Sequence, residues 1–365
     1  KKYYYDSATT SEIFYEHQAM VNSGYDFHDF ASESVITSYK DISSANVSQV
    51  QTITYTERDR YGNALQQTID ARDAGNALID HKVITNVYEG KLAAMKGNAK
   101  TSEVLRYADL AATNLIERTF TETLEFDLKG NALHQTTDRF VSGKLATRTD
   151  TLNTVINSRG DAEEQNITTS QTDETGLVAS LKVTSFQVLK KRTFDSNHNV
   201  TNQFILTYTN VSKSDLKDAQ EIRSTGFTSS GVAVNQVIAT YSDAAKTSLI
   251  DCKVIYNEVV NPQGYVEKSI VTTYFAAVVN ELGDITYSKE SDKTVTVTTS
   301  FDNRGNALIQ DIKKYYYDDK SAAADKEIFI QRYMRADDPA DPNQWHSIVK
   351  RVAELRAGVE ETRQL

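Results

Sequence analysis

The sequence predicts a mainly β protein, built as a long array of antiparallel β-hairpin repeats with a C-terminal α-helix. Three observations predict this fold. The tetrapeptide Gly-Asn-Ala-Leu recurs along the chain, polar and aliphatic residues follow it at fixed offsets, and the flanking segments alternate with period two. Alternation with period two is typical of strands, and a recurring unit indicates a repeat architecture. The array comprises eight units of about 33 residues.

Each predicted unit has an anchor residue in its first turn, the Gly of Gly-Asn-Ala-Leu or its equivalent. The anchors, spaced by 30 to 41 residues, are Gly62, Gly97, Gly130, Gly160, His198, Gly231, Gly264 and Gly305. Asp or Asn commonly stands three residues before the anchor. Asp caps its own backbone and Gly adopts positive φ, a conformation in which His is also enriched, so we expect a tight turn. Turn capping also explains this motif without calcium, because the alternating carboxylates of calcium loops are missing.

A second turn is expected about half a unit later. It is marked by Gly75, Gly143, Gly176 and Gly283. Each unit is therefore predicted to be a pair of strands of roughly ten residues, and the array to be a long β-meander.

A row of glutamines, named here the polar ladder, follows the anchors. Five residues after an anchor stand Gln67, Gln135, Gln165, Gln203, Gln236 and Gln310. Aliphatic residues flank them on the same strand face, so the amides are predicted to be half-buried and bonded to a neighbouring strand. This interpretation makes the ladder a device that fixes strand register. The alternative is a row of side chains that contacts a ligand.

Three regions are expected along the chain. Residues 1–48 form a partial repeat and a connecting segment, 49–318 the hairpin array, and 319–365 a C-terminal helical cap. Within the array, residues 101–117 fit both a strand and an inserted helix. The helical spacing is carried by Val104, Ala108, Ala111 and Leu115.

The tail carries an apolar stripe whose members are alternately four and three residues apart. These residues are Ile348, Val352, Leu355 and Val359. The spacing predicts an interaction helix. It either covers the open edge of its own sheet or pairs with another chain.

The hexapeptide at residues 1–6 recurs at residues 313–318, where it completes a repeat. The sequence therefore begins in the middle of a repeat. We expect partners of two kinds, neighbouring repeats of a longer parent chain or further copies of this one. A mature terminus after removal of a propeptide is the alternative.

Composition excludes several function classes. There are 40 Lys and Arg against 50 Asp and Glu, a net charge of -10 without a basic tract, which argues against nucleic acid as a partner. No apolar run is long enough for a membrane-spanning helix. The single cysteine, Cys252, excludes an intramolecular disulfide and is expected to be a small core residue.

No motif of an enzyme is present, so we predict no catalytic residues, no cofactor and no metal. The six histidines lack the spacing of metal ligands. Asp26, His28 and Asp29 lie close together in sequence, and a solvated loop is favoured there over a metal site. An enzyme on this scaffold would need paired carboxylates that meet in a cleft.

The aromatic-Asp-x-x-Gly-Asn turn at residues 126–131 and 301–306 resembles the YD-repeat family of Rhs-type bacterial surface and toxin-shell proteins. The resemblance covers about residues 50–318. This chain has Phe where the family usually has Tyr, and a longer period. The resemblance implies an extended β-sheet that curls into a shell or fibre and carries no catalytic residues.

The leading hypothesis is a structural, surface-exposed repeat segment of a larger bacterial protein, extracellular or at the cell surface, that forms a β scaffold, filament or shell. One alternative is an adhesin or a carbohydrate- or protein-binding module. A second is part of a toxin-encapsulating shell. The repeat pattern is shared by an open sheet, a shell and a solenoid.

Overall fold

The structure is a computed structural model, and it describes residues 2–6, 11–41, 43–280, 284–302, 305–316, 326–335, 345–350, 354–356 and 359–361. Side chains are described over residues 17–41, 43–280, 284–302 and 305–315. The chain forms two compact units. Unit 1 comprises Lys1–His198 and Phe204–Lys217, and unit 2 comprises Asn199–Gln203 and Asp218–Leu365.

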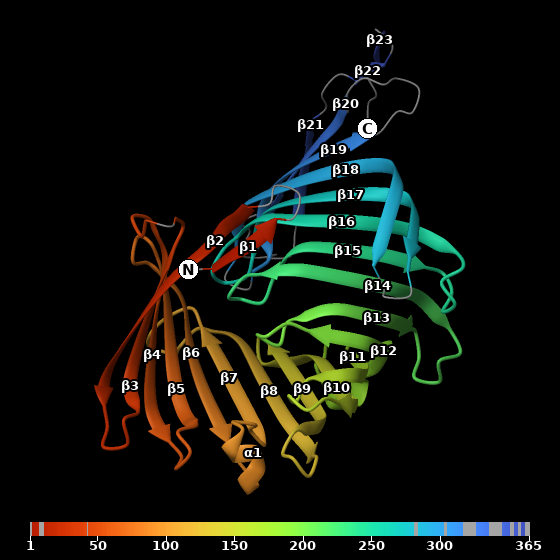
Figure 1. Cartoon of the computed structure of the whole chain (residues 1–365). Helices are drawn as coiled ribbons and strands as arrows, with labels where there is room; N and C mark the ends of the chain where they lie inside the picture. The colour runs from red at the N-terminus through yellow and green to blue at the C-terminus, as the bar shows by residue number, and fades with distance from the viewer. Residues whose placement is uncertain are drawn as a thin grey trace. The chain divides into compact units, whose positions relative to one another are not determined.

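Unit 1 is a meander of antiparallel strands, each paired with the next along the chain. Figure 1 shows β3 to β9 side by side in chain order. The strands are β1 (Lys2–Asp6), β2 (Ser11–Tyr25), β3 (Ala31–Tyr39), β4 (Val47–Arg58), β5 (Ala64–Asp73), β6 (Leu78–Val87), β7 (Thr101–Tyr107), β8 (Leu115–Phe126), β9 (Ala132–Val141), β10 (Lys144–Ile156), β11 (Ala162–Gln171) and β12 (Lys182–Phe194).

Unit 2 repeats this arrangement, with antiparallel pairing from β14 through β21. Its strands are β14 (Leu216–Phe227), β15 (Ala233–Tyr241), β16 (Leu249–Val260), β17 (Val266–Val279), β18 (Ile285–Phe301), β19 (Ala307–Tyr316), β20 (Lys326–Arg335), β21 (Trp345–Lys350), β22 (Glu354–Arg356) and β23 (Val359–Glu361). The residues of β13 (Val200–Tyr208) are divided between the two units. The prediction of a mainly β, antiparallel hairpin array is confirmed.

The helical insertion predicted over residues 101–117 is wrong, and the strand alternative is right. Thr101–Tyr107 is β7, which pairs with β6 and β8. Ala108 and Ala111 lie in the loop that follows, where Asp109 accepts hydrogen bonds from backbone N–H groups. Pairing on both sides decides the conformation, because strand propensity depends on neighbours more than on sequence.

Helices are short. The helix α1 (Lys91–Met95) precedes β7, and a single 3-10 turn, η1 (Val178–Ser180), precedes β12. Within the part of the chain that the structure describes, no helix is long and apolar enough to cross a membrane.

The predicted C-terminal helix is also wrong. Ile348 lies in β21, which pairs with β20, while Leu355 and Val359 lie in the paired strands β22 and β23. Val352 lies outside the described residues. Spacings of three and four residues therefore span successive short strands here instead of one helix face.

The core of each unit is thin, because most strand positions are only half-buried. In unit 2 it centres on the neighbouring residues Ala219, Ala239 and Cys252, each 0% exposed. Burial raises the pKa of the Cys252 thiol to about 11, so the expectation of a small core residue is confirmed. Cross-strand ion pairs occur in both units, and one of the most buried joins Arg106 Nε to Asp80 Oδ2 at 2.5 Å in unit 1.

Candidate functional site

Four of the first turns, those that carry the anchors, are closed by a pair of side chains, one amide and one carboxylate. Asp127 Oδ1 accepts the backbone N–H groups of Lys129 and Asn131, both at 2.8 Å, and Asn131 Nδ2 donates to Asp127 Oδ2 at 2.8 Å. The backbone N–H of Gly130 donates to Asp127 O at 2.9 Å. These bonds satisfy the backbone groups that a hairpin end leaves unpaired.

The same pair of side chains recurs in three other first turns, and the order of the amide and the carboxylate along the chain varies. Asn63 Nδ2 donates to Asp59 Oδ2 at 2.8 Å, and Asn306 Nδ2 to Asp302 Oδ2 at 2.7 Å. At residues 157–161 the order is reversed, so Asn157 Nδ2 donates to Asp161 Oδ2 at 3.2 Å. In these four turns the pair is one amide and one carboxylate, at either of the two positions.

The structure places all eight anchors in the left-handed region, with φ from 65° at His198 to 95° at Gly160. Gly97 reaches it as the residue after Lys96, the C-cap of α1, and donates its N–H to Ala94 O at 3.0 Å. In the second turns, Gly143 and Gly176 have positive φ. At residues 73–77 the left-handed residue is Asn76, with φ 66°, instead of Gly75, and Gly283 lies outside the described residues.

A further first turn at residues 26–30 escaped the sequence analysis. Asp26 Oδ1 accepts the N–H groups of His28 and Phe30 at 2.8 and 2.9 Å, and Asp29 takes the left-handed position with φ 63°. The expected solvated loop is therefore another copy of the repeat turn. The offsets could have found it, because Ser34 and Ile36 stand five and seven residues after Asp29.

Successive first turns touch through what we call a turn step, in which the residue after one anchor lies against the next anchor. A Cβ added at Gly62 would lie 2.6 Å from Phe30, and one added at Gly160 would lie 3.1 Å from Asn131 Oδ1. At Gly97 the facing atom is Asn63 Oδ1, at 3.4 Å. At Gly62 and Gly160 a side chain would press into the neighbouring turn, and the positive φ of the anchors favours glycine as well.

Unit 2 has turn steps of the same kind. Asn199 Oδ1 would lie 3.8 Å from a Cβ at Gly231, Val232 would lie 3.5 Å from one at Gly264, where Ser230 is closer at 3.2 Å, and Tyr265 lies against Gly305. The residue after the anchor changes from amide to aliphatic to aromatic, whereas the anchor stays glycine. The approach is tightest at Gly305 and is an ordinary van der Waals contact at Gly231.

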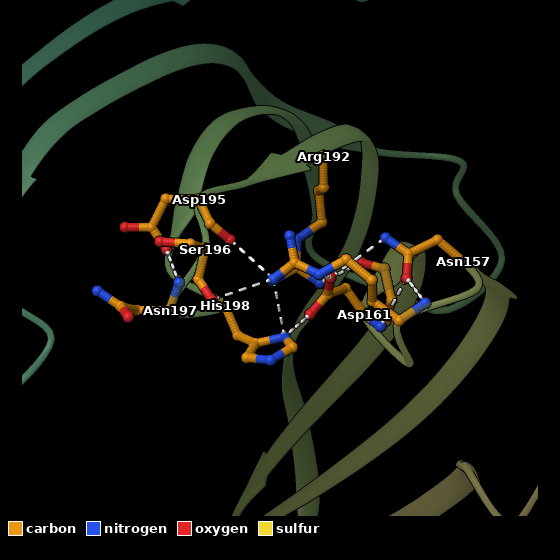
Figure 2. A network of polar contacts seen from close by, with 9 residues as sticks. Asn157, Asp161, Arg192, Asp195, Ser196, Asn197 and His198 are labelled. Atoms are coloured by element: carbon orange, nitrogen blue, oxygen red, sulfur yellow. Dashed lines mark hydrogen bonds and ion pairs between the residues drawn. The ribbon is translucent and has the colours of Figure 1, made fainter.

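One step in unit 1 uses a different chemistry, shown in Figure 2. His198 replaces the glycine anchor, and its Nδ1 bonds to Oδ1 of Asp161, the residue after the preceding anchor. Arg159 Nη2 donates to Asp195 O at 2.9 Å. In this step the Asp161 carboxylate contacts the His198 imidazole, whereas in other steps an Asn amide contacts a glycine. Arg159 also joins the same two turns.

Asp161 is the electrostatic centre of this step. Its side chain is 4% exposed. Burial by itself would raise the pKa of Asp161, but hydrogen bonds from His198 and Asn157 and the charges of His198 and Arg159 outweigh it and lower the pKa. The carboxylate is therefore held ionised by the neighbouring turn.

The polar ladder bonds to the preceding strand. Four glutamines donate Nε2 to the residue twelve positions earlier, directly across the hairpin: Gln135 to Thr123 (3.1 Å), Gln165 to Asn153 (2.6 Å), Gln236 to Ser224 (3.0 Å) and Gln310 to Thr298 (3.1 Å). Gln67 lies opposite Tyr55, and Gln203 lies in β13.

Two of these acceptors, and Asn257 at the same position opposite Ser269, continue the contact into the preceding repeat unit. Asn153 Nδ2 donates to Ala132 O at 2.8 Å, Thr123 Oγ1 to Ala99 O at 3.0 Å, and Asn257 Nδ2 to Ala233 O at 2.8 Å. Each accepting alanine stands two residues after an anchor. β12 lacks a Thr, Asn or Ser at the corresponding position, and there Arg192 Nη1 donates to Ala162 O at 2.8 Å instead.

The opposite ends of the hairpins carry a second loop that the sequence analysis missed. Its Asp or Asn accepts backbone N–H groups, and the residue three positions later has positive φ without being glycine. These pairs are Asp41 and Ser44, Asp109 and Ala112, Asn210 and Lys213, and Asp243 and Lys246. A tyrosine two residues before each Asp or Asn was the available signal.

Among the residues that the structure describes, no group of three His, Cys, Asp or Glu side chains is placed to hold a metal ion. The described repeat residues instead bond to one another and to backbone groups of neighbouring turns. The arrangement can join hairpins and fix their register.

No protein-family model matches the sequence, and no curated protein is similar to it. Among solved structures, the crystal structure of TcdB2-TccC3 is similar at 12% identity with a TM-score of 0.14, over 89% of this chain and 20% of that chain. The chain thus spans about a fifth of the matched chain. A likeness at this TM-score carries no argument.

Proposed function

We propose that the chain is a structural β scaffold, a surface-exposed repeat segment whose role is to build and present a long sheet. The observation that carries the proposal is the use of the repeated polar residues. The ladder amides and the residues that follow the anchors contact neighbouring strands and turns. Residues at the repeat's most regular positions thus serve assembly of the array.

The proposal includes four statements about the protein beyond its fold. They are an extracellular or cell-surface location, membership of the YD-repeat type, association with neighbouring repeats or further copies, and the lack of enzyme activity. The turn chemistry supports the second part, because an Asp-x-x-Gly-Asn turn followed by a strand recurs at residues 59–63, 127–131 and 302–306.

Deletion of one unit tests the scaffold role. In a repeat array each unit contacts only its neighbours, so a whole unit can be removed without loss of the fold. We expect a variant lacking residues 231–263, from one anchor to the residue before the next, to keep its β circular dichroism per residue and to unfold cooperatively. The matched control lacks residues 233–248, which hold β15 and its following loop.

The control removes a single strand and so reverses the direction of every later strand. We expect it to lose the β signal or to aggregate. If the whole-unit deletion unfolds as fully as the half-unit deletion, the scaffold proposal fails.

A binding module is the second candidate, favoured by two exposed apolar tips. Phe27 and Leu128 are each 96% exposed and occupy the same turn position, two residues before an anchor. Contiguous exposed apolar patches mark contact surfaces, and these two tips share one position of the repeat. A glycan and protein binding screen of F27S/L128S against the unmodified chain tests it, and equal binding of the two would remove it.

A further inference from the structure

Four first turns and α1 follow one another at one end of the unit 1 strands, and we call this surface the turn ridge. Asn63, in the turn before α1, donates Nδ2 to Ala94 O of α1 at 2.7 Å. Asn98, just after α1, donates Nδ2 to Gly130 O of the next turn at 2.7 Å. The outer turns join through the turn steps described above. Figure 1 shows α1 and the loops that join β4 to β5 and β8 to β9 at the same end of the strands. The turn ridge comprises residues 26–30, 59–63, 89–98, 127–131 and 157–161.

The two residues that follow the capping Asp or Asn form the tip of each of these turns. Along the turn ridge the tips are Phe27-His28, Arg60-Tyr61, Leu128-Lys129 and Ser158-Arg159, and α1 adds Lys91, Leu92, Met95 and Lys96. In the later first turns the pairs at 196–197, 229–230, 262–263 and 303–304 are Ser-Asn, Ser-Ser, Pro-Gln and Asn-Arg. The combination of large apolar and basic side chains is therefore particular to the turn ridge.

The apolar tips project from the turns. Phe27 and Leu128 are each 96% exposed, and Leu92 and Met95 are 50% and 56% exposed. A rigid partner would need a separate socket for each of these side chains, at the spacing of the repeat. A lipid bilayer takes up Phe and Leu side chains at any point of its interface. The exposure thus fits a fluid apolar layer better than a shaped groove.

The exposed charges of the turn ridge are mostly positive, although the whole chain has a net charge of -10. Three exposed residues are acidic, namely Asp26, Asp29 and Glu89, whereas five are basic, namely Arg60, Lys91, Lys96, Lys129 and Arg159. The carboxylates of Asp59 and Asp127 are half-buried and accept backbone N–H groups of their own turns. Basic side chains beside apolar tips complement a surface of negatively charged headgroups.

We propose that the turn ridge docks on a lipid bilayer that carries anionic headgroups. The apolar tips Phe27 and Leu128 enter the interface, and the basic side chains of the ridge contact the headgroup phosphates. The proposal goes beyond the scaffold role. It gives the exposed tips of the binding candidate a partner of stated chemistry, and it can fail while either proposed function stands.

Flotation of the full chain with vesicles tests the proposal. We expect the chain to float with vesicles of equal parts phosphatidylcholine and phosphatidylglycerol, to stay behind with phosphatidylcholine alone, and to be released by added salt. F27S/L128S removes the apolar tips and should lower the partition coefficient at least about tenfold. K91S/K129S removes two cations and should lower it by about 10- to 30-fold, because each basic side chain near an anionic surface contributes about fivefold.

The matched control is L110S/V211S, which replaces two apolar residues in the second loops of unit 1, 50% and 55% exposed. It should bind as the unmodified chain does, and circular dichroism checks that every variant folds. Insertion is read from Phe27→Trp, whose fluorescence should shift to the blue with the anionic vesicles, whereas that of Leu110→Trp should not. Both are compared with the unmodified chain, which contains Trp345.

Three results would overturn the proposal. They are a chain that floats with neither vesicle, equal binding to both vesicles, and binding that F27S/L128S leaves unchanged. A glycan or protein found in the screen of F27S/L128S, without vesicle binding, would keep the binding module and remove the bilayer as its partner. None of these results would affect the unit-deletion test of the scaffold.

Discussion

Two neighbouring turn steps of unit 1 achieve the same contact with different chemistry. In the first, Asn131 lies against Gly160, whose backbone adopts φ 95°. In the second, Asp161 bonds to His198, which adopts φ 65° with a full side chain. The first step depends on the lack of a side chain, and the second on a charge-assisted hydrogen bond.

What the repeat requires is contact between successive turns, and glycine at the anchor is only one way to meet that requirement. The two substitutions are coupled, since His at the anchor comes with Asp at the residue that faces it. The partner within the turn changes as well, because Asn157 supplies the amide that Asp161 no longer provides. Three positions in two turns thus change together.

Breaking a glycine anchor should have the largest effect. We expect Gly130→Ala to lower the free energy of unfolding by about 2–5 kcal/mol, the sum of left-handed strain and overpacking. A Cβ there would lie 2.6 Å from Ala93 N, in the backbone of α1. The matched control is Gly143→Ala, with φ 75° and no atom within 4 Å of its Cβ, which should cost only about 1–2 kcal/mol. Urea unfolding measures both, and equal losses would refute the role of close approach.

Breaking the His198 step should have the next largest effect. Asp161→Asn removes a buried carboxylate that accepts from two turns, and we expect a loss of about 1–3 kcal/mol in denaturant unfolding. Adding Asn157→Asp restores one amide and one carboxylate within the turn and should recover part of the loss. Adding His198→Gly as well converts the step to the glycine type. If the triple variant is no more stable than Asp161→Asn, the two step types are not equivalent.

The polar ladder offers a smaller contrast. Gln236→Ala removes the hydrogen bond to Ser224, which is 5% exposed. It should lower the free energy of unfolding by about 1 kcal/mol, measured by thermal or urea unfolding. Gln67→Ala should lower the free energy of unfolding by less, because the residue opposite Gln67 is Tyr55, where the bonded glutamines have Thr, Asn or Ser as acceptor. A larger loss for Gln67 than for Gln236 would contradict the register role of the bonds.

Acid should weaken the turns gradually, with the smallest effect per site. Burial alone would raise the pKa of Asp127, but the hydrogen bonds from Asn131 and Lys129 lower it below 3.8. A carboxyl whose pKa is lowered by folding stabilises the fold above its unfolded pKa. That stability is lost as the pH falls through the folded pKa. The melting temperature should thus fall below about pH 4, and Asp127→Asn should flatten this slope.

The sequence predicted the turns well where their chemistry is local. The eight anchors have positive φ, and the Asp or Asn that stands three residues before six of them is a turn residue because its own side chain caps the backbone. Asp29 was missed because the search began from glycine, although the left-handed region also admits Asp. The strand offsets, which come from pairing with the next strand, are the more general signal.

Contacts between successive repeats were harder to predict. The residues that accept from the ladder are Thr, Asn or Ser, so no single residue type marks them, and their positions become visible only with the register. The helical spacing at residues 101–117 and in the tail was misleading for a related reason. Strand pairing with distant segments decides those conformations, and local periodicity does not report it.

The coupling between Asp161 and His198 tests most directly whether turns bind one another. Free energies of unfolding of the unmodified chain, Asp161→Asn, His198→Gly and the double variant form a thermodynamic cycle that isolates their interaction. We predict a favourable coupling of about 1–2 kcal/mol, as for residues in one hydrogen-bonded network. A coupling of zero within error would show that the two turns lie side by side without stabilising one another, and would contradict the claim that turns bind one another.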